Sequence, residues 1–358
     1  MSSGRAVPTP VPRGGLLLHV GPHKTGTTTV QNAFVARRDD LAAHGVAYPG
    51  KSAAPHGAVI ARLGTWSGWY DEIAPTSIRR WERFCETTRS LDATVVVSSE
   101  ALCHADDEQA AALCAELRPG PARVLLTLRP LAALLPSSWQ EYLKAGWTET
   151  YPEFLDWVLR RPDDDGNPVR SFWTRQDHGR LVDRWARAVG AENVTVVVAD
   201  PSRPRLLLDA VEDLAGLPRN FLGTTAEESV ANRSLTWPEC ALLRQINIVA
   251  RTTMDWERYN TLMRGGAFST LVGSYRPDGP AERAGLPAWA ADAAADLGAR
   301  SVASIMASGV EVVGDLAALS RATAVDGPDD EPGQIAIDAV VTASAGITSA
   351  AVRRLQHR

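Results

Sequence analysis

The stretch LLLHVGPHKTGTTT, residues 16–29, constrains this chain more than any other part of it. An apolar run of strand length stops at Gly21-Pro22, lysine, glycine and hydroxyl residues follow, and apolar residues at helical spacing begin at Val30. The order is therefore strand, tight loop and helix. Backbone N–H groups of such a loop and the positive end of the next helix form an anion site, and Lys24 adds a mobile charge. The stretch predicts a phosphate-binding loop, with a purely structural turn as the alternative.

Composition limits where such an anion site can lie. The 358 residues suffice for one large α/β domain with an extension or for two small domains. Hydrophobic residues make up 45% and charged residues 22%, which is near the average of globular proteins. A net charge of -5 and a pI of about 5.9 argue against general nucleic-acid binding. Any anion site must be local.

Cysteine usage and the N-terminal residues bear on the compartment. The four cysteines form no C-x-x-C pair and have no clustered histidines, so neither a zinc site nor a disulfide framework is predicted. The N-terminal residues lack the apolar core of a signal peptide, and no run approaches about eighteen apolar residues. We therefore expect a cytoplasmic protein with no transmembrane segment and no bound metal.

Strand and helix patterns alternate after the loop. Short apolar or β-branched runs predict strands at residues 45–49, 93–98, 123–128 and 193–198. Apolar residues at helical spacing predict helices at residues 76–91, 106–117, 178–189, 206–217, 237–251 and 288–319, and one that opens at Arg129-Pro130. The alternation predicts an α/β fold of three layers, in which helices flank a central parallel sheet and the C-terminal part is helical.

Breaks in these patterns divide the chain. Repeated prolines predict a flexible leader over residues 1–13, and the α/β domain is expected to span residues 14–320. Acidic residues with glycine and proline predict a linker over residues 321–333, and residues 334–358 are expected to form a terminal helix. Because ligands bind at the carboxyl ends of parallel strands, the loop, Glu100 and Arg129 are expected to share one edge of the sheet.

The loop differs from the common nucleotide-triphosphate loop. In that loop, G-x-x-x-x-G-K-[ST], the lysine follows the second glycine, whereas Lys24 precedes Gly26 here. The stretch instead resembles the 5′-phosphosulfate loop of the sulfotransferases that use 3′-phosphoadenosine 5′-phosphosulfate (PAPS). The matching residues are Pro22, Lys24, Thr25, Gly26, Thr27 and Thr28.

Arg129 and Ser137 resemble a second motif of the same family. Its members hold the 3′-phosphate with an arginine at a strand end and a serine eight residues later, and this chain has the same spacing. A strand-end arginine can fork onto a phosphate, while a serine two turns along the next helix offers its hydroxyl to the same group. A surface arginine and an ordinary helix serine are the alternative. Over about residues 14–250 the chain resembles a bacterial-type sulfotransferase of the carbohydrate and small-molecule branch.

This resemblance implies a fold, a reaction and a set of donor-binding residues. The fold is related to that of the P-loop NTPases. The reaction moves a sulfuryl group from PAPS to a hydroxyl or amine of a carbohydrate or other small acceptor and releases adenosine 3′,5′-bisphosphate. Lys24 and the loop would stabilise the leaving 5′-phosphate oxygen without a metal ion. The expected cofactor-binding residues are His23, Lys24, Thr25, Gly26, Thr27, Thr28, Arg129, Ser137 and Arg233.

Glu100 is the expected general base. In carbohydrate-directed branches of the family a glutamate serves as base, and Glu100 stands at the end of the strand before the Arg129 strand. Its alternative role is to complement the dipole of the following helix. His56 and His104 are competing bases. The candidate catalytic residues are therefore Lys24, Glu100 and His56.

Departures from the family pattern leave other functions open. Cytosolic members stack a tryptophan on adenine after the loop threonines, whereas this chain has Thr29, so another residue must hold adenine. Arg264-Gly265-Gly266 matches only poorly the late segment that closes over the 3′-phosphate in those members. A P-loop kinase or NTPase would need a lysine after the second glycine and a strand-end aspartate for Mg²⁺. A nucleotide-binding protein without catalysis would not need Glu100.

Overall fold

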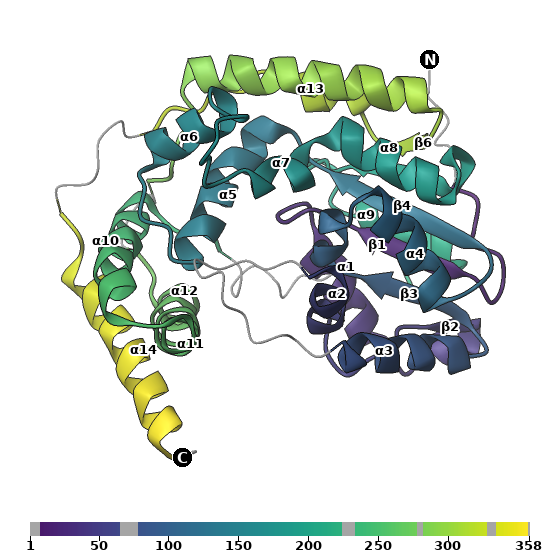
Figure 1. The fold of residues 1–358 in the computed structure, drawn as a ribbon, viewed down its shortest axis with the longest axis horizontal. Helices are drawn as coiled ribbons and strands as arrows, with labels where there is room; N and C mark the ends of the chain where they lie inside the picture. Colours follow the sequence, from purple (N-terminus) through teal and green to yellow (C-terminus); the bar gives the residue numbers. More distant parts are fainter. Residues whose placement is uncertain (1–7, 65–77, 224–232, 278–281, 328–333, 357–358) are drawn as a thin grey trace.

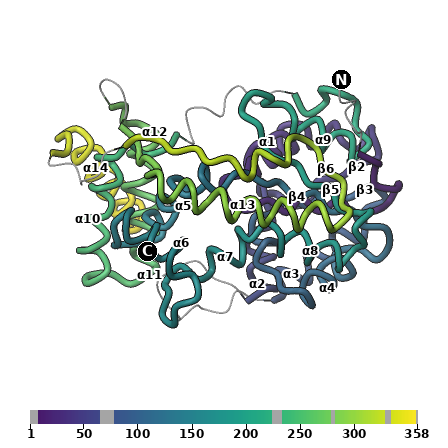
Figure 2. Tube along the Cα trace, turned by 90° about the horizontal axis from the view of Figure 1, so that it is seen from above, coloured from purple at the N-terminus to yellow at the C-terminus, as the bar shows by residue number. Residues whose placement is uncertain are grey.

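The computed structural model describes residues 8–64, 78–223, 233–277, 282–327 and 334–356, and Figure 1 shows their arrangement. One part of the molecule is built around a β-sheet. The other part consists of helices, among them α10 (Trp237–Thr253) and α14 (Ile337–Gln356). Figure 2 shows the two parts side by side, with α13 (Ala288–Ser308) running along both.

The sheet has six strands in the order β2-β3-β1-β4-β5-β6, and each neighbouring pair is parallel. The central strand β1 pairs with β3 on one side and with β4 on the other, with Leu18 opposite Val97 and Val124. The strands are β1 (Leu16–Val20), β2 (Val46–Ala47), β3 (Thr94–Ser98), β4 (Ala122–Leu128), β5 (Val194–Val198) and β6 (Glu311–Val313). The predicted parallel sheet is confirmed.

Helices cover both faces of this sheet because alternate strand residues point to opposite sides. Leu16 and Leu18 belong to one buried cluster and Leu17 to another. The first face is covered by α2 (His56–Leu63), α3 (Arg79–Ser90), α4 (Asp107–Leu117) and α8 (His178–Val189). The second is covered by α1 (Thr27–Ala36) and α9 (Leu206–Ala215). The three predicted layers are therefore present.

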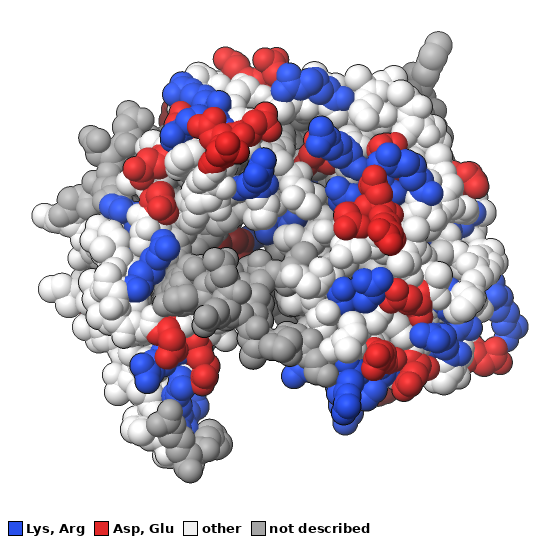
Figure 3. Space-filling model, in the orientation of Figure 1, with Lys and Arg blue, Asp and Glu red and all other residues white. Residues whose placement is uncertain are grey.

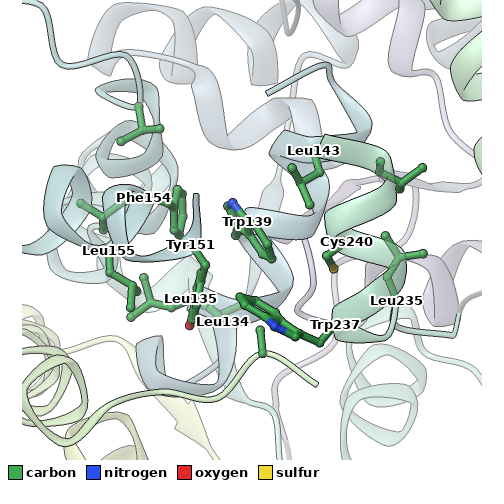
Figure 4. Close-up of a cluster of buried hydrophobic side chains, with 14 of the residues drawn as sticks. Leu134, Leu135, Trp139, Leu143, Tyr151, Phe154, Leu155, Leu235, Trp237 and Cys240 are labelled. Atoms are coloured by element: carbon green, nitrogen blue, oxygen red, sulfur yellow. The ribbon is translucent and has the colours of Figure 1, made fainter. Parts of the chain in front are cut away.

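Aromatic side chains form the core of the helical part. Trp139 of α5 (Leu131–Lys144) has its ring centroid 5.2 Å from that of Tyr151 and 5.5 Å from that of Trp237. Figure 4 shows these rings between α5, α6 (Tyr151–Leu159) and α10. The same tryptophan therefore packs α5, the helix after β4, against α6 and α10.

The helix expected over residues 288–319 is confirmed as far as Ser308 and is wrong beyond it. α13 ends at Ser308, and Gly309 takes a left-handed conformation with φ 72°. The chain then adds β6 to the edge of the sheet, followed by a 3₁₀ helix at Leu316–Ser320. Three strand residues are too few to interrupt a helical pattern in the sequence.

The C-terminal helix docks through glycines. α14 packs against the π-helix η5 (Asn260–Phe268) and against α12 (Ser269–Ser274), which follow the short helix α11 (Trp256–Tyr259). A Cβ atom on Gly266 would lie 2.8 Å from the carbonyl oxygen of Gly346. The two helices therefore approach so closely that neither glycine has room for a side chain.

The proline-rich start and the acidic segment are more tightly bound than expected. Val11 is buried, and its N–H donates to the carbonyl of Leu214 at 2.8 Å, so packing begins before residue 14. Leu286 and Val325 exchange backbone hydrogen bonds at 2.7 and 3.1 Å. The described part of residues 321–333 therefore lies against residues that precede α13. Residues 1–7 and 328–333 lie outside the described residues.

Candidate active site

The predicted phosphate loop joins β1 to α1 in a conformation that suits anion binding. Gly26 caps α1 with φ 104°, and no described side chain caps the first turn of this helix. Lys24 is also left-handed, with φ 70°, although it is not glycine. Such a conformation costs about 1–2 kcal/mol, so contacts elsewhere in the loop must hold it. The N-terminal amides of α1 and the loop together form a cradle of the kind that anions occupy.

Gly21 and two threonines hold the loop. The hydroxyl of Thr25 donates to the carbonyl of Pro22 at 2.7 Å, and that of Thr27 donates to the carbonyl of Gly21 at 3.3 Å. A Cβ atom on Gly21 would lie 2.8 Å from Thr27 Oγ1 and 3.1 Å from Thr25 Oγ1. Only glycine leaves room for these contacts. Thr25 and Thr27 are buried, so their hydroxyls shape the loop, while Thr28 is exposed at the start of α1.

His19, on β1 just before the loop, bonds to both neighbouring strands. Its Nδ1 lies 2.9 Å from Ser98 Oγ on β3, and its Nε2 lies 2.8 Å from Thr127 Oγ1 on β4. The imidazole therefore links three neighbouring strands beneath Gly21. Burial lowers the pKa of His19 to about 4, so the ring is neutral at pH 7. No local pattern in the sequence indicates this role, because Ser98 and Thr127 are distant in the chain.

The lysine of the loop is paired with a carboxylate from α5. Lys24 Nζ lies 2.8 Å from Glu141 Oε1, and Lys144 Nζ lies 2.8 Å from the same oxygen. Burial by itself would raise the pKa of Glu141, but the charges and hydrogen bonds of Lys144 and Lys24 outweigh it and lower the pKa to about 2. Glu141 is therefore ionised at neutral pH. Sequence analysis missed this residue because nothing local marks its contact with the loop.

Arg129 and the loop adjoin, as the shared sheet edge predicts. Arg129 Nη1 donates to the carbonyl oxygen of Lys24 at 3.2 Å. Burial lowers the pKa of Arg129, and no acidic side chain among the described residues forms an ion pair with it. Ser137 lies on α5, where its hydroxyl donates to the carbonyl of Leu134 at 2.9 Å. A partly buried guanidinium without a carboxylate partner suits an anionic ligand.

Glu100 contacts the helix that follows the loop. It begins the 3₁₀ helix η2 (Glu100–His104), and its Oε2 accepts a hydrogen bond of 3.2 Å from Gln31 Nε2 on α1. Burial and the charge of Arg175 lower the pKa of His23 to about 4. The charges of Glu100 and Glu141 act in the opposite direction and raise this pKa, but they are outweighed. The structure therefore brings the expected base to the loop.

Three histidines gather near Glu100. Burial and, to a smaller extent, the charges of Arg175, His23 and His56 together lower the pKa of His104 to about 3. His56 begins α2 and is exposed. A useful general base has a pKa near the working pH, so His23 and His104 are poor bases at neutral pH. The roles of Glu100 and His56 as general bases stay predictions.

Arg175 is a further site residue that the sequence did not reveal. It lies on α7 (Ser171–Gln176), donates from Nη2 to the hydroxyl of Tyr142 at 2.8 Å, and lowers the pKa of both His23 and His104. α7 packs against η2. Arg175 therefore adds positive charge to the side of the site that carries Glu100. An arginine within an arginine-rich chain carries no local signal of such a position.

Two weaker expectations fall on residues engaged elsewhere. Arg233 pairs with the buried Glu239 at 2.5 Å and also donates to the carbonyls of Leu271 and Tyr275. Glu239 is part of the capping box of α10, so Arg233 ties this cap to α12. Arg264 lies on η5 beside Asn260, at 3.4 Å, in the helix that packs on α14. In this structure the donors of Arg233 serve the helical part.

A separate cavity of about 860 Å³ lies between α6, α7, α8 and α13. Trp173, Arg184 and Arg300 are among its lining residues, but the loop, Glu100 and Arg129 are not. We give it no part in the site. Among the described residues, no group of three or more His, Cys, Asp or Glu side chains is placed to hold a metal ion. Within the same residues, no helix is both long and apolar enough to cross a bilayer.

Comparisons with known proteins add one similarity. No family model matches the chain, and no curated protein matches its sequence. Among solved structures, the chain is similar to a sulfotransferase from Alicyclobacillus acidocaldarius, with 15% identity and a TM-score of 0.41 over 67% of this chain and 98% of that chain. A similarity at this level assigns no activity to the chain.

Proposed function

We propose that this protein is a sulfotransferase that moves a sulfuryl group from PAPS to a hydroxyl or amine of a carbohydrate or other small molecule. The observation that carries the proposal is the hydrogen bond from Arg129 to the carbonyl of Lys24. This hydrogen bond holds two anion-binding groups, Arg129 and the phosphate loop, next to each other at the carboxyl ends of the parallel strands. A nucleotide that is charged at both its 5′ and 3′ ends, such as PAPS, matches this arrangement.

Different residues of the chain would have different roles in such a transfer. The loop, with His23, Thr25, Gly26, Thr27 and Thr28, would hold the 5′-phosphate, while Arg129 and Ser137 would hold the 3′-phosphate. As the acceptor oxygen bonds to sulfur, the bond from sulfur to the 5′-phosphate oxygen breaks, and Lys24 stabilises the charge on that oxygen. Glu100 takes the proton of the acceptor, which leaves adenosine 3′,5′-bisphosphate and the sulfated product.

The base is tested by substitution. Glu100→Gln should lose sulfuryl transfer from labelled PAPS while it keeps its affinity for adenosine 3′,5′-bisphosphate, because the new side-chain amide would still contact Gln31 but cannot accept a proton. His56→Asn is the comparison. Unchanged transfer in Glu100→Gln together with lost transfer in His56→Asn would move the role to the histidine.

Nucleotide preference separates this function from its alternatives. Adenosine 3′,5′-bisphosphate without Mg²⁺ should raise the melting temperature, whereas ATP with Mg²⁺ should change it little. The physical reason is that the loop and Arg129 are two separate anion-binding groups, one for each phosphate of the bisphosphate. The opposite ranking would favour a kinase or NTPase. Stabilisation by the bisphosphate without transfer to any acceptor would favour a nucleotide-binding protein without catalysis.

A further inference from the structure

Lysine is rare in this chain, and two of its lysines meet at one oxygen. The sequence contains three lysines, Lys24, Lys51 and Lys144. Lys24 and Lys144 each place Nζ 2.8 Å from Oε1 of Glu141. Their two ammonium groups therefore lie no farther apart than twice that distance. The side chains of Lys24, Lys144 and Glu141 are 34%, 25% and 35% exposed, so a ligand can reach all three.

The face of α5 that carries Glu141 also carries the serine expected to hold the 3′-phosphate. Ser137, Glu141 and Lys144 stand at positions i, i+4 and i+7 of the helix and so share one face. Lys144 is the last residue of α5, where the helix dipole favours a positive charge. This row of side chains meets the phosphate loop at Lys24.

Charge explains why the carboxylate is needed. Two ammonium groups this close repel each other unless an anion lies between them. Glu141 supplies that anion, since it is ionised at neutral pH. Two lysines and one carboxylate leave a net positive charge beside a loop that is itself suited to anions. A phosphate oxygen is also negatively charged and accepts charge-assisted hydrogen bonds from ammonium groups, as the carboxylate oxygen in this place does.

We propose that Lys144 is a second donor-binding cation, and that Glu141 is a built-in competing anion that the donor nucleotide displaces from Lys24 and Lys144. The inference rests on the proposed function, because it takes the displacing ligand to be a nucleotide phosphate. Two lysines rather than one then bind the 5′-phosphate end of the donor. Until the donor binds, Glu141 keeps the two ammonium groups side by side.

The test is calorimetric titration of the full chain with adenosine 3′,5′-bisphosphate at low salt. Lys144→Ala should weaken binding about tenfold, since it removes a charge-assisted contact. Lys144→Arg should recover most of the loss. Lys51→Ala is the matched control, because this third lysine is exposed and its hydrogen bond with Arg38 uses the backbone carbonyl, which the substitution keeps. It should bind as the unaltered protein does.

Glu141→Gln should change the affinity for the bisphosphate in the opposite direction. It therefore separates competition between Glu141 and the nucleotide phosphate from a structural role of Glu141. Removal of the competing charge should tighten binding about fivefold, the range of a partly exposed ion pair. Unchanged binding in Lys144→Ala, or weaker binding in Glu141→Gln, would overturn the inference. Failure of the unaltered protein to bind the bisphosphate at all would instead overturn the proposed function.

Discussion

Lys24 is the residue on which the proposed reaction depends most. Its backbone is left-handed, its carbonyl accepts from Arg129, and its ammonium lies at the loop rim on Glu141. Lys24→Ala should lower the rate of sulfuryl transfer by roughly two orders of magnitude or more, as when one strong oxyanion donor is lost. Transfer of labelled sulfate from PAPS to a panel of sugars and phenols measures the effect. Transfer at the unaltered rate would remove Lys24 from the mechanism, and Lys51→Ala is the control.

The sequence predicts the residues that act through the backbone or through local spacing. The loop, Glu100 and Arg129 stand at predicted strand ends, and the structure brings Arg129 to the loop and Glu100 to the helix after it. Ser137 was expected from the family resemblance, and its role stays a prediction. Glu141 and Arg175 could not be found in this way. Their roles depend on which side chain a distant helix turns toward the loop, and neither helical periodicity nor composition encodes that contact.

At the scale of elements, the strands expected at residues 45–49, 93–98, 123–128 and 193–198 are present as β2, β3, β4 and β5, whereas β6 and the π-helix η5 were not predictable. β3 and β5 are continuous β-branched runs, and they appear where expected. β6 is a strand because it completes the sheet edge beside β5, a tertiary contact without a local pattern. The π-helix η5 has no sequence signature either. Its position against α14 depends on the close approach of Gly266 and Gly346.

The close contact between Gly266 and Gly346 predicts the effect of an alanine substitution on stability. A Cβ atom at Gly346 would lie 2.7 Å from Thr270 Oγ1 and closer still to the backbone of Gly266, so Gly346→Ala should destabilise the protein by about 1–3 kcal/mol. Gly273→Ala in the neighbouring helix α12 is the control, because nothing lies within 4 Å of its added atom. It should be neutral or stabilising by up to about 1 kcal/mol. Urea unfolding measures both, and equal effects would contradict this account of the docking.

At the scale of the whole molecule, charges of both signs are mixed on the surface (Figure 3), and two histidines are buried inside. Lys and Arg side chains are interspersed with Asp and Glu over the face seen in Figure 3. His19 and His178 are each 1% exposed, and burial lowers the pKa of each to about 4. The unfolded chain takes up these protons near pH 6.5, whereas the folded chain does not until about pH 4. Stability should therefore fall as the pH drops through this window.

His178 allows this acid dependence to be tested. Neither ring nitrogen has a hydrogen-bond partner among the described residues, and the side chain lies at the start of α8. His178→Leu removes one of the two buried histidines that are protonated only on unfolding. The unaltered protein should therefore lose about 2 kcal/mol more of its unfolding free energy between pH 7.5 and pH 5 than His178→Leu does. Urea unfolding at both pH values gives the difference. An unchanged fall would show that His178 is protonated in the folded protein.

The hydrogen bond between Arg129 and the backbone of Lys24 has a consequence for ligand choice. It joins the strand end of β4 to the loop after β1, two elements that the sheet already holds side by side. The hydrogen bond therefore holds the Arg129 guanidinium beside the loop, which limits the distance between the two anion-binding groups. On the proposed function, the molecule selects a nucleotide by the spacing between its two charged groups, so a nucleotide whose phosphates all lie on one side of the ribose has the right charge at the wrong interval.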